Sequence, residues 1–240
     1  MKLEEIYAYL DALSPFASQE SWDNSGLLVG SKEDEVDTMC LCLDVDEYVL
    51  ESVPDGTLII AHHPLIFKGL KRLDTGCYPA SLLKTMLRRN IGLVAMHTNI
   101  DKSHLNRYVC EQVFGFEVLS QEEYVCICRF EESFEALSLH VKNVLGVEQL
   151  RTVFLEGVVE TVAVTTGSGG DLIGRIEASC FLTGDIKYHQ AMEAKANNLG
   201  LIDIGHFESE RYFGEVLAPH LKNFPLKVIM SNSKNPFTII

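Results

Sequence analysis

Short, almost uninterrupted runs of apolar residues that end in polar side chains constrain the fold of this chain most. Leu58–Ile60 is such a run, and the segment Ala61-His62-His63-Pro64 follows it. Pro64 has no backbone N–H to donate to a sheet and fixes its own φ, so we expect the strand to end there and open into a loop. The run therefore predicts a buried strand with two histidines at its tip.

Two adjacent histidines at a strand end allow two interpretations. Because successive side chains alternate across a strand, we expect the rings of His62 and His63 to point in opposite directions, so that one strand end could serve two metal ions. An isolated His-His pair is more often one hydrogen-bonded core histidine and one exposed histidine. The metal interpretation gains weight only because three other apolar runs also end in metal-binding residue types.

Those three runs lie further along the chain. Each is followed by ligand-type side chains: Ile91–Met96 by His97 and Asp101, Ala178–Leu182 by Thr183 and Asp185, and Leu199–Ile204 by His206 and Glu210. Further strands are predicted at 36–45, 125–130, 158–165 and 227–230. Helical spacing of apolar residues predicts helices at 2–13, 79–90, 104–114, 133–145, 186–197 and 206–217.

This alternation of strands and helices predicts an α/β fold. In open α/β sheets, ligands bind beyond the carboxyl ends of strands. We therefore expect the polar residues after the four runs to lie near a functional site.

The last predicted helix places two of these residues one turn apart. His206 and Glu210 stand at i and i+4, on the same helix face. An imidazole and a carboxylate at this spacing can chelate one ion, or the carboxylate can bridge two ions. A simple polar pair within the helix is the alternative.

Two turn-rich segments carry weaker signals. The segment 21–30 is interpreted as a loop with an Asx-turn. Gly167-Ser168-Gly169-Gly170 can cradle a phosphate, but it matches neither the P-loop nor the dinucleotide-binding pattern, and a tight turn between strand and helix explains it equally well.

Composition excludes several classes of protein. Hydrophobic residues make up 47% of the 240 residues, yet no run approaches the length of a membrane helix, and we expect a cytoplasmic protein. The seven cysteines lie mostly in apolar runs without a C-x-x-C pair, which indicates buried thiols in a reducing compartment. The formal net charge of −14 argues against a surface that binds duplex DNA.

Five segments together resemble one known family. Asp23-Asn24-Ser25-Gly26-Leu27, Ala61-His62-His63-Pro64, His97-Thr98-Asn99-Ile100-Asp101, Thr183-Gly184-Asp185 and Gly205-His206-Phe207-Glu208-Ser209-Glu210 are similar, in this order, to motifs of the NGG-interacting-factor-three-like family. Members of this family are also named homologues of GTP cyclohydrolase I type 2.

The resemblance implies two α/β domains of similar topology, with a dinuclear metal site in the cleft between them, and a homohexameric ring. A change in composition near residues 121–123 places the boundary between a first domain, 1–122, and a second, 123–240, with the C-terminal strand returning to the first domain.

The resemblance also implies a set of site residues. The metal ligands would be His62, His63, Asp101, His206 and Glu210, with Glu210 as the bridge and with His97 as a catalytic residue in or beside the site. Asp185 departs from the glutamate that relatives more often have after Thr-Gly, and because its side chain is shorter it is not among the implied ligands.

This mixed nitrogen and oxygen donor set suits Zn, Fe, Mn or Ni, at two divalent ions per chain. Three functions follow as hypotheses: a metal-dependent hydrolase of a nucleotide-like small molecule, a metal-binding or scaffold protein without turnover, and a ring that encircles nucleic acid. The charge makes the third the weakest.

Overall fold

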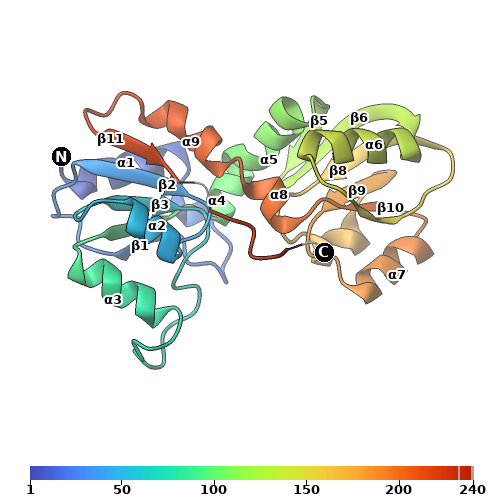
Figure 1. Ribbon diagram of the computed structural model, residues 1–240. Coiled ribbons are helices and arrows are strands. Elements are labelled where there is room, and N and C mark those ends of the chain that lie inside the picture. The colour runs from blue at the N-terminus through green and yellow to red at the C-terminus, as the bar shows by residue number, and fades with distance from the viewer. Residues whose placement is uncertain (232, 239–240) are drawn as a thin grey trace. The chain divides into compact units, whose positions relative to one another are not determined.

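A computed structural model describes residues 1–231 and 233–238 (Figure 1). These residues form two compact units. The first consists of Met1–Ile100 together with the segment from Phe213 onward, and the second is Asp101–Tyr212. Each unit contains a sheet and helices, so the mixed α/β fold is confirmed.

The sheet of the first unit is mainly parallel. Within the described residues it has five strands, in the order β1 (Gly26–Val29), β4 (Gly92–Ala95), β3 (Leu58–Ala61), β2 (Thr38–Cys42) and β11 (Lys227–Met230). Only β1 runs antiparallel to its neighbour. Ala61 of β3 pairs with Ala95 of β4, so these two strands end at the same edge of the sheet.

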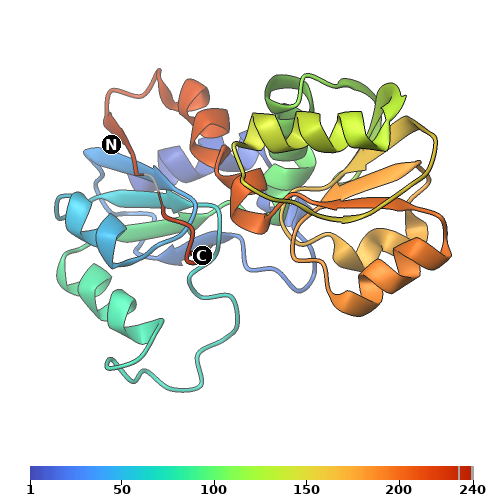
Figure 2. The ribbon, with the colours of Figure 1, turned by 45° about the vertical axis from the view of Figure 1, so that its right-hand side comes forward.

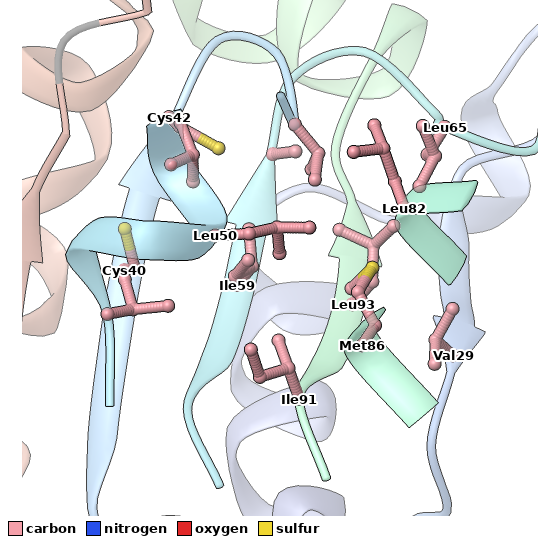
Figure 3. Close-up of a cluster of buried hydrophobic side chains, with 14 of the residues drawn as sticks. Val29, Cys40, Cys42, Leu50, Ile59, Leu65, Leu82, Met86, Ile91 and Leu93 are labelled. Carbon is pink, nitrogen blue, oxygen red and sulfur yellow. The ribbon is translucent and has the colours of Figure 1, made fainter. Parts of the chain in front are cut away.

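Helices cover both faces of this sheet. On one face, α2 (Glu47–Ser52) and α3 (Ala80–Arg88) bury an apolar cluster, in which Figure 3 shows Leu50 and Met86 among Ile59 and Leu93. On the other face lie α1 (Leu3–Leu13) and α9 (Phe213–Leu221). The buried Leu3, Ile6 and Leu10 of α1 recur at helical spacing, which is why this segment packs as an amphipathic helix.

The sheet of the second unit is mixed. Within the described residues it has six strands, in the order β5 (Glu117–Glu122), β6 (Val125–Ser133), β8 (Val158–Val164), β9 (Cys180–Thr183), β10 (Gly200–Asp203) and β7 (Arg151–Val153). Strands β8, β9 and β10 are parallel, and the outer pairs are antiparallel. Figure 2 shows α6 (Phe134–Leu145) and α7 (Tyr188–Ala196) on opposite sides of this sheet. The short helix η4 (Gly170–Arg175) follows β8 and contributes Ile173 to the core beneath α7.

Two predicted helices differ from the observed ones. The segment predicted as a helix at 104–114 belongs to a longer stretch with wide π-helical turns: α4 (Thr98–Ile100), η2 (Asp101–Leu105), α5 (Asn106–Tyr108) and η3 (Val109–Val113). Such turns are frequent at functional sites. The helix predicted at 206–217 is two helices, α8 (His206–Glu210) and α9, because the chain leaves the helical path after Arg211.

Two positions that define the predicted domains, the boundary after residue 122 and the C-terminal strand, can be located in the structure. The boundary predicted after residue 122 falls at the tight turn between β5 and β6, where Glu123 has a φ of 52°. The C-terminal strand β11 pairs in parallel with β2 of the first unit.

The positions of the cysteines agree with the prediction of buried thiols. Six of the seven cysteines are buried and Cys77 is exposed. Among the described helices, none has the length and apolar character that crossing a membrane requires.

Candidate functional site

The carboxyl ends of β3 and β4 bring three histidines together in the first unit. The ring centroids of His62 and His97 lie 5.2 Å apart, and those of His63 and His97 lie 5.6 Å apart. Each ring offers one nitrogen, and the three atoms lie within 4.8 Å of one another. This group, His62, His63 and His97, is called the histidine group below.

The expectation that His62 and His63 point in opposite directions is wrong. Their ring centroids are 4.9 Å apart and the rings are tilted by 48°. The reason is that β3 ends at Ala61, so the alternation of side chains across a strand no longer applies to the two residues that follow.

Each imidazole of the histidine group is held at Nδ1 by an oxygen that can only accept a hydrogen bond. His62 Nδ1 lies 2.9 Å from the backbone oxygen of Met96. His63 Nδ1 lies 2.7 Å from Asp44 Oδ1, and His97 Nδ1 lies 2.7 Å from Asp23 Oδ1. Since Nδ1 must then carry the proton, a neutral ring presents its lone pair at Nε2, as metal-ligating histidines do.

Asp23 is the centre of a buried network around His97. Its Oδ2 accepts hydrogen bonds from the backbone N–H of Thr98 at 3.1 Å, the Thr98 hydroxyl at 2.6 Å and the Ser25 hydroxyl at 3.0 Å. Burial alone would raise the pKa of this carboxyl, but the hydrogen bonds and charge of His97 and the hydrogen bond from Thr98 outweigh it and hold the pKa well below its usual range. The Asp23 side chain is therefore an ionised anchor for His97.

In the second unit, His206 and Glu210 are paired along α8. His206 Nε2 lies 2.9 Å from Glu210 Oε2, as the i, i+4 spacing allows, and the Glu210 side chain is buried. His206 Nδ1 lies 2.7 Å from Asp185 Oδ2. The short side chain of Asp185 thus does reach His206, and its backbone φ of 56° is one that aspartate tolerates better than most residues.

The glycine loop after β8 makes room for the Glu210 carboxylate. A Cβ atom at Gly167 would lie 2.0 Å from Glu210 Oε1 and 3.5 Å from His206 Nε2, and the φ of this residue is 63°. Both the space and the backbone conformation require glycine here. Gly167 therefore leaves the space, or cradle, that the carboxylate of Glu210, a candidate metal ligand, occupies.

The remaining predicted residues have these positions. Asp101 opens the wide turn η2 and its side chain is buried. The Thr183 hydroxyl accepts a hydrogen bond from the Gly169 N–H at 2.8 Å and donates to the Gly167 oxygen, which is a structural role in the turn. Among the described residues, His189 belongs to no group that could hold a metal ion.

The side chains of the histidine group, and the pair His206 and Glu210, are of the types that bind divalent metal ions. Imidazole nitrogens with a fixed lone pair, together with carboxylates, form a donor set that suits Zn, Fe, Mn or Ni. The cradle at Gly167 and the anchored Nδ1 atoms show that the ligand-bearing side chains are held in place by their surroundings. Residue groups that could hold a metal ion are thus present in the chain.

Comparison with known proteins identifies the family. A family model described as Duf34/NIF3 (NGG1p interacting factor 3) matches residues 1–236. The chain belongs to the Duf34/NIF3 family. The resemblance of the five sequence motifs to this family is therefore confirmed.

Relatives of this Duf34/NIF3 chain align over its whole length. A Campylobacter jejuni protein named GTP cyclohydrolase 1 type 2 homolog is 51% identical over 99% of both chains. A Helicobacter pylori protein named GTP cyclohydrolase 1 type 2 is 39% identical over 99% of both chains. The Staphylococcus aureus hypothetical protein SA1388 superimposes with a TM-score of 0.90 at 26% identity, covering 100% of this chain and 99% of that one.

Sequence reasoning missed the residues that anchor the histidines. Asp23 lies in the segment 21–30, which is predicted as a loop, and Asp44 lies near the end of the strand predicted at 36–45, yet both hold Nδ1 of a histidine. Their sequence signal was present in the polar residues Asp23-Asn24-Ser25 and in an aspartate that follows an apolar strand. From those patterns alone, the histidine that each carboxylate contacts cannot be predicted.

Proposed function

We propose that this Duf34/NIF3 chain is a dinuclear, metal-dependent hydrolase of a nucleotide-like substrate. The observation that carries the proposal is the histidine group, in which each ring is fixed at Nδ1 and presents Nε2. The names of the Campylobacter and Helicobacter relatives support a nucleotide as the substrate class.

The proposed ligands come from both units. They are His62, His63, Asp101, His206 and Glu210, and we propose that they assemble into one site for two divalent ions that share Glu210. Two such ions, when bound, supply Lewis-acid activation of water and neutralise charge on substrate oxygens. Five protein ligands leave coordination positions for water and substrate, as catalytic sites require.

His97 is the proposed proton carrier. Asp23 holds its Nδ1, so its Nε2 can accept a proton from the attacking water and return it to the leaving group. The charge of Asp23 also stabilises the imidazolium that forms in between. The alternative role for His97 is to support the carboxylate of Asp101 without carrying a proton.

The substrate determines which bond this chemistry breaks. For a purine nucleotide such as GTP, water addition at C8 opens the five-membered ring and hydrolysis then releases formate. For a phosphate ester, water attacks phosphorus and the alcohol leaves. In both cases the chain must exclude bulk water, hold the nucleotide and move one proton.

Metal stoichiometry tests the site. Elemental analysis after reconstitution should find two divalent ions per chain, and Glu210→Gln should weaken both, whereas His63→Ala should weaken chiefly one. Glu193→Gln, on α7, is the control for the loss of one carboxylate. A maximum of one ion per chain would reject the dinuclear site.

Turnover tests the reaction. Metal-loaded protein is incubated with GTP and other nucleotides, and the products are identified by mass. We expect consumption that a chelator and Glu210→Gln abolish and that His97→Ala reduces by about 10²- to 10⁴-fold, the usual contribution of a general acid or base. If two ions are bound but no nucleotide is consumed, a metal-binding protein without turnover is the better description.

The assembly is proposed from the resemblance alone. A homohexamer with a small-molecule substrate is expected, and light scattering of the purified protein measures its mass directly. A monomer at every concentration would contradict this part of the proposal.

A further inference from the structure

Two exposed aromatic side chains lie beside the histidine group in the first unit. The ring centroids of Trp22 and Phe67 are 6.0 Å apart, and each lies 6.2 Å from that of His97. Trp22 is 57% exposed and Phe67 is 41% exposed. Neighbouring exposed aromatics at the edge of a candidate site are typical of a surface that contacts a ligand.

The neighbours of both side chains are fixed by polar contacts. Trp22 precedes Asp23, whose buried carboxylate binds His97 and Thr98. Phe67 follows Ile66, whose backbone oxygen accepts a hydrogen bond from Asn24 Nδ2 at 2.5 Å. The two rings therefore extend from anchored backbone, and a ligand that contacts them need not order these backbone segments first.

The three rings meet one another at steep angles. Trp22 and Phe67 are tilted by 59° to each other, and they meet His97 at 76° and 81°. None of the three pairs is stacked face to face. Because Trp22 and Phe67 are also exposed, a flat heteroaromatic ring can stack on either of them beside His97.

Basic side chains follow Phe67 directly. Lys68, Lys71 and Arg72 lie in the exposed segment 67–73, and none forms an ion pair or side-chain hydrogen bond with another described residue. Three cations within five residues stand out in a chain of net charge −14. Lysine and arginine side chains of this kind are the usual partners of phosphate groups.

We propose that Trp22 and Phe67 hold the base of a purine nucleotide beside His97, and that Lys68, Lys71 and Arg72 bind its phosphate. The inference rests on the proposed function, because it names the substrate-binding residues of that same site. It adds that binding depends on the base, so that a sugar phosphate without a base binds poorly.

The single tryptophan of the chain provides a direct readout of base stacking. Because Trp22 is the only tryptophan, its fluorescence reports on this surface alone. Metal-loaded protein is titrated at constant ionic strength with GMP, guanosine and ribose 5-phosphate, with excitation at the red edge of tryptophan absorption. We expect GMP and guanosine to quench the fluorescence, and ribose 5-phosphate to leave it unchanged.

Variants separate the base from the phosphate. Phe67→Ala should weaken GMP and guanosine by about tenfold each, which corresponds to the loss of one stacking contact. Lys71→Ala should weaken GMP but not guanosine. Phe154→Ala, which removes another 57% exposed aromatic, and Lys195→Ala on α7 are the matched controls and should change neither affinity. For Trp22→Ala, calorimetry replaces fluorescence and should show the same loss as Phe67→Ala.

The outcomes distinguish this inference from the proposed function. Quenching without turnover supports the binding surface and removes the hydrolase. Turnover without quenching, with Phe67→Ala unchanged in KM, overturns the binding surface and leaves the hydrolase. Fluorescence that responds to protein concentration but not to GMP also overturns the inference, because Trp22 then lies in a contact between copies of the chain.

Discussion

At the scale of single residues, the candidate ligands depend on carboxylates that are distant in sequence. Asp23 is 74 residues from His97, and Asp185 is 21 residues from His206. The histidines themselves could be predicted, since they follow apolar strands. Their anchors could not, because a hydrogen bond between distant residues depends on tertiary packing that a local pattern does not encode.

The contact between Asp185 and His206 predicts an effect on metal binding. Asp185→Asn keeps the size of the side chain and tolerates the left-handed backbone, but it removes the charge that orients His206. We expect metal affinity to fall by about tenfold, the lower end of the effect of such anchoring residues. Competition with a fluorescent chelator measures it, and Asp171→Asn, whose carboxylate instead binds Gln190, is the control. Equal affinities for the two variants would show that the anchor is unimportant.

Gly167 predicts a stability cost that can be separated into two parts. Gly146 has nearly the same φ, 66° against 63°, but a Cβ atom there meets nothing within 4 Å. Gly146→Ala therefore measures the backbone cost alone, about 1–2 kcal/mol. Gly167→Ala should reduce the free energy of unfolding in urea by a further 1–3 kcal/mol or so, because the new methyl group overlaps the Glu210 carboxylate. Identical losses would mean that this carboxylate moves away without cost.

At the scale of elements, burial determined what the sequence could predict. The strands β2, β3, β9 and β10 are almost wholly buried and read as continuous apolar runs. The edge strands β5 and β7 are largely exposed and were not predicted, because strands exposed to water lack that signal. The predicted helix at 206–217 is too long, because the helical spacing of apolar residues continues past Glu210. The helix nevertheless breaks between α8 and α9, and the spacing gives no sign of this break.

Helix α6 predicts opposite effects for two serines. Ser133 is the N-cap of this helix, and its Oγ accepts a hydrogen bond from the Ala136 N–H at 3.2 Å. Ser133→Ala should lower the free energy of unfolding by about 1 kcal/mol. Among the described residues, the buried Ser138 hydroxyl has no hydrogen-bond partner, so Ser138→Ala should be neutral or stabilising. Urea unfolding of both variants checks this, and destabilisation by Ser138→Ala would contradict it.

At the scale of the whole molecule, charge limits the choice of partner. With a net charge of −14 and a pI of about 4.9, the chain as a whole repels phosphate backbones. The two divalent ions proposed for the site would offset only a small part of this charge. The basic segment 67–73 is suited to one nucleotide rather than to a long duplex.

Binding of duplex DNA should therefore be weak at physiological salt. Fluorescence anisotropy with a labelled duplex, repeated over a range of salt concentrations, measures both affinity and salt dependence. We expect little binding from the metal-loaded protein and no change for Lys68→Ala. Tight binding with a steep salt dependence would instead favour a ring that encircles nucleic acid.

The return of β11 to the first unit sets an order of events during synthesis. The ribosome releases the chain from its amino end, so β2 lacks its outer parallel neighbour until Lys227–Met230 has emerged. The second unit is continuous from Asp101 to Tyr212 and can complete its sheet before that moment. Domains usually mature in the order in which they are translated. Here the unit that carries His62 and His63 is begun first and finished last.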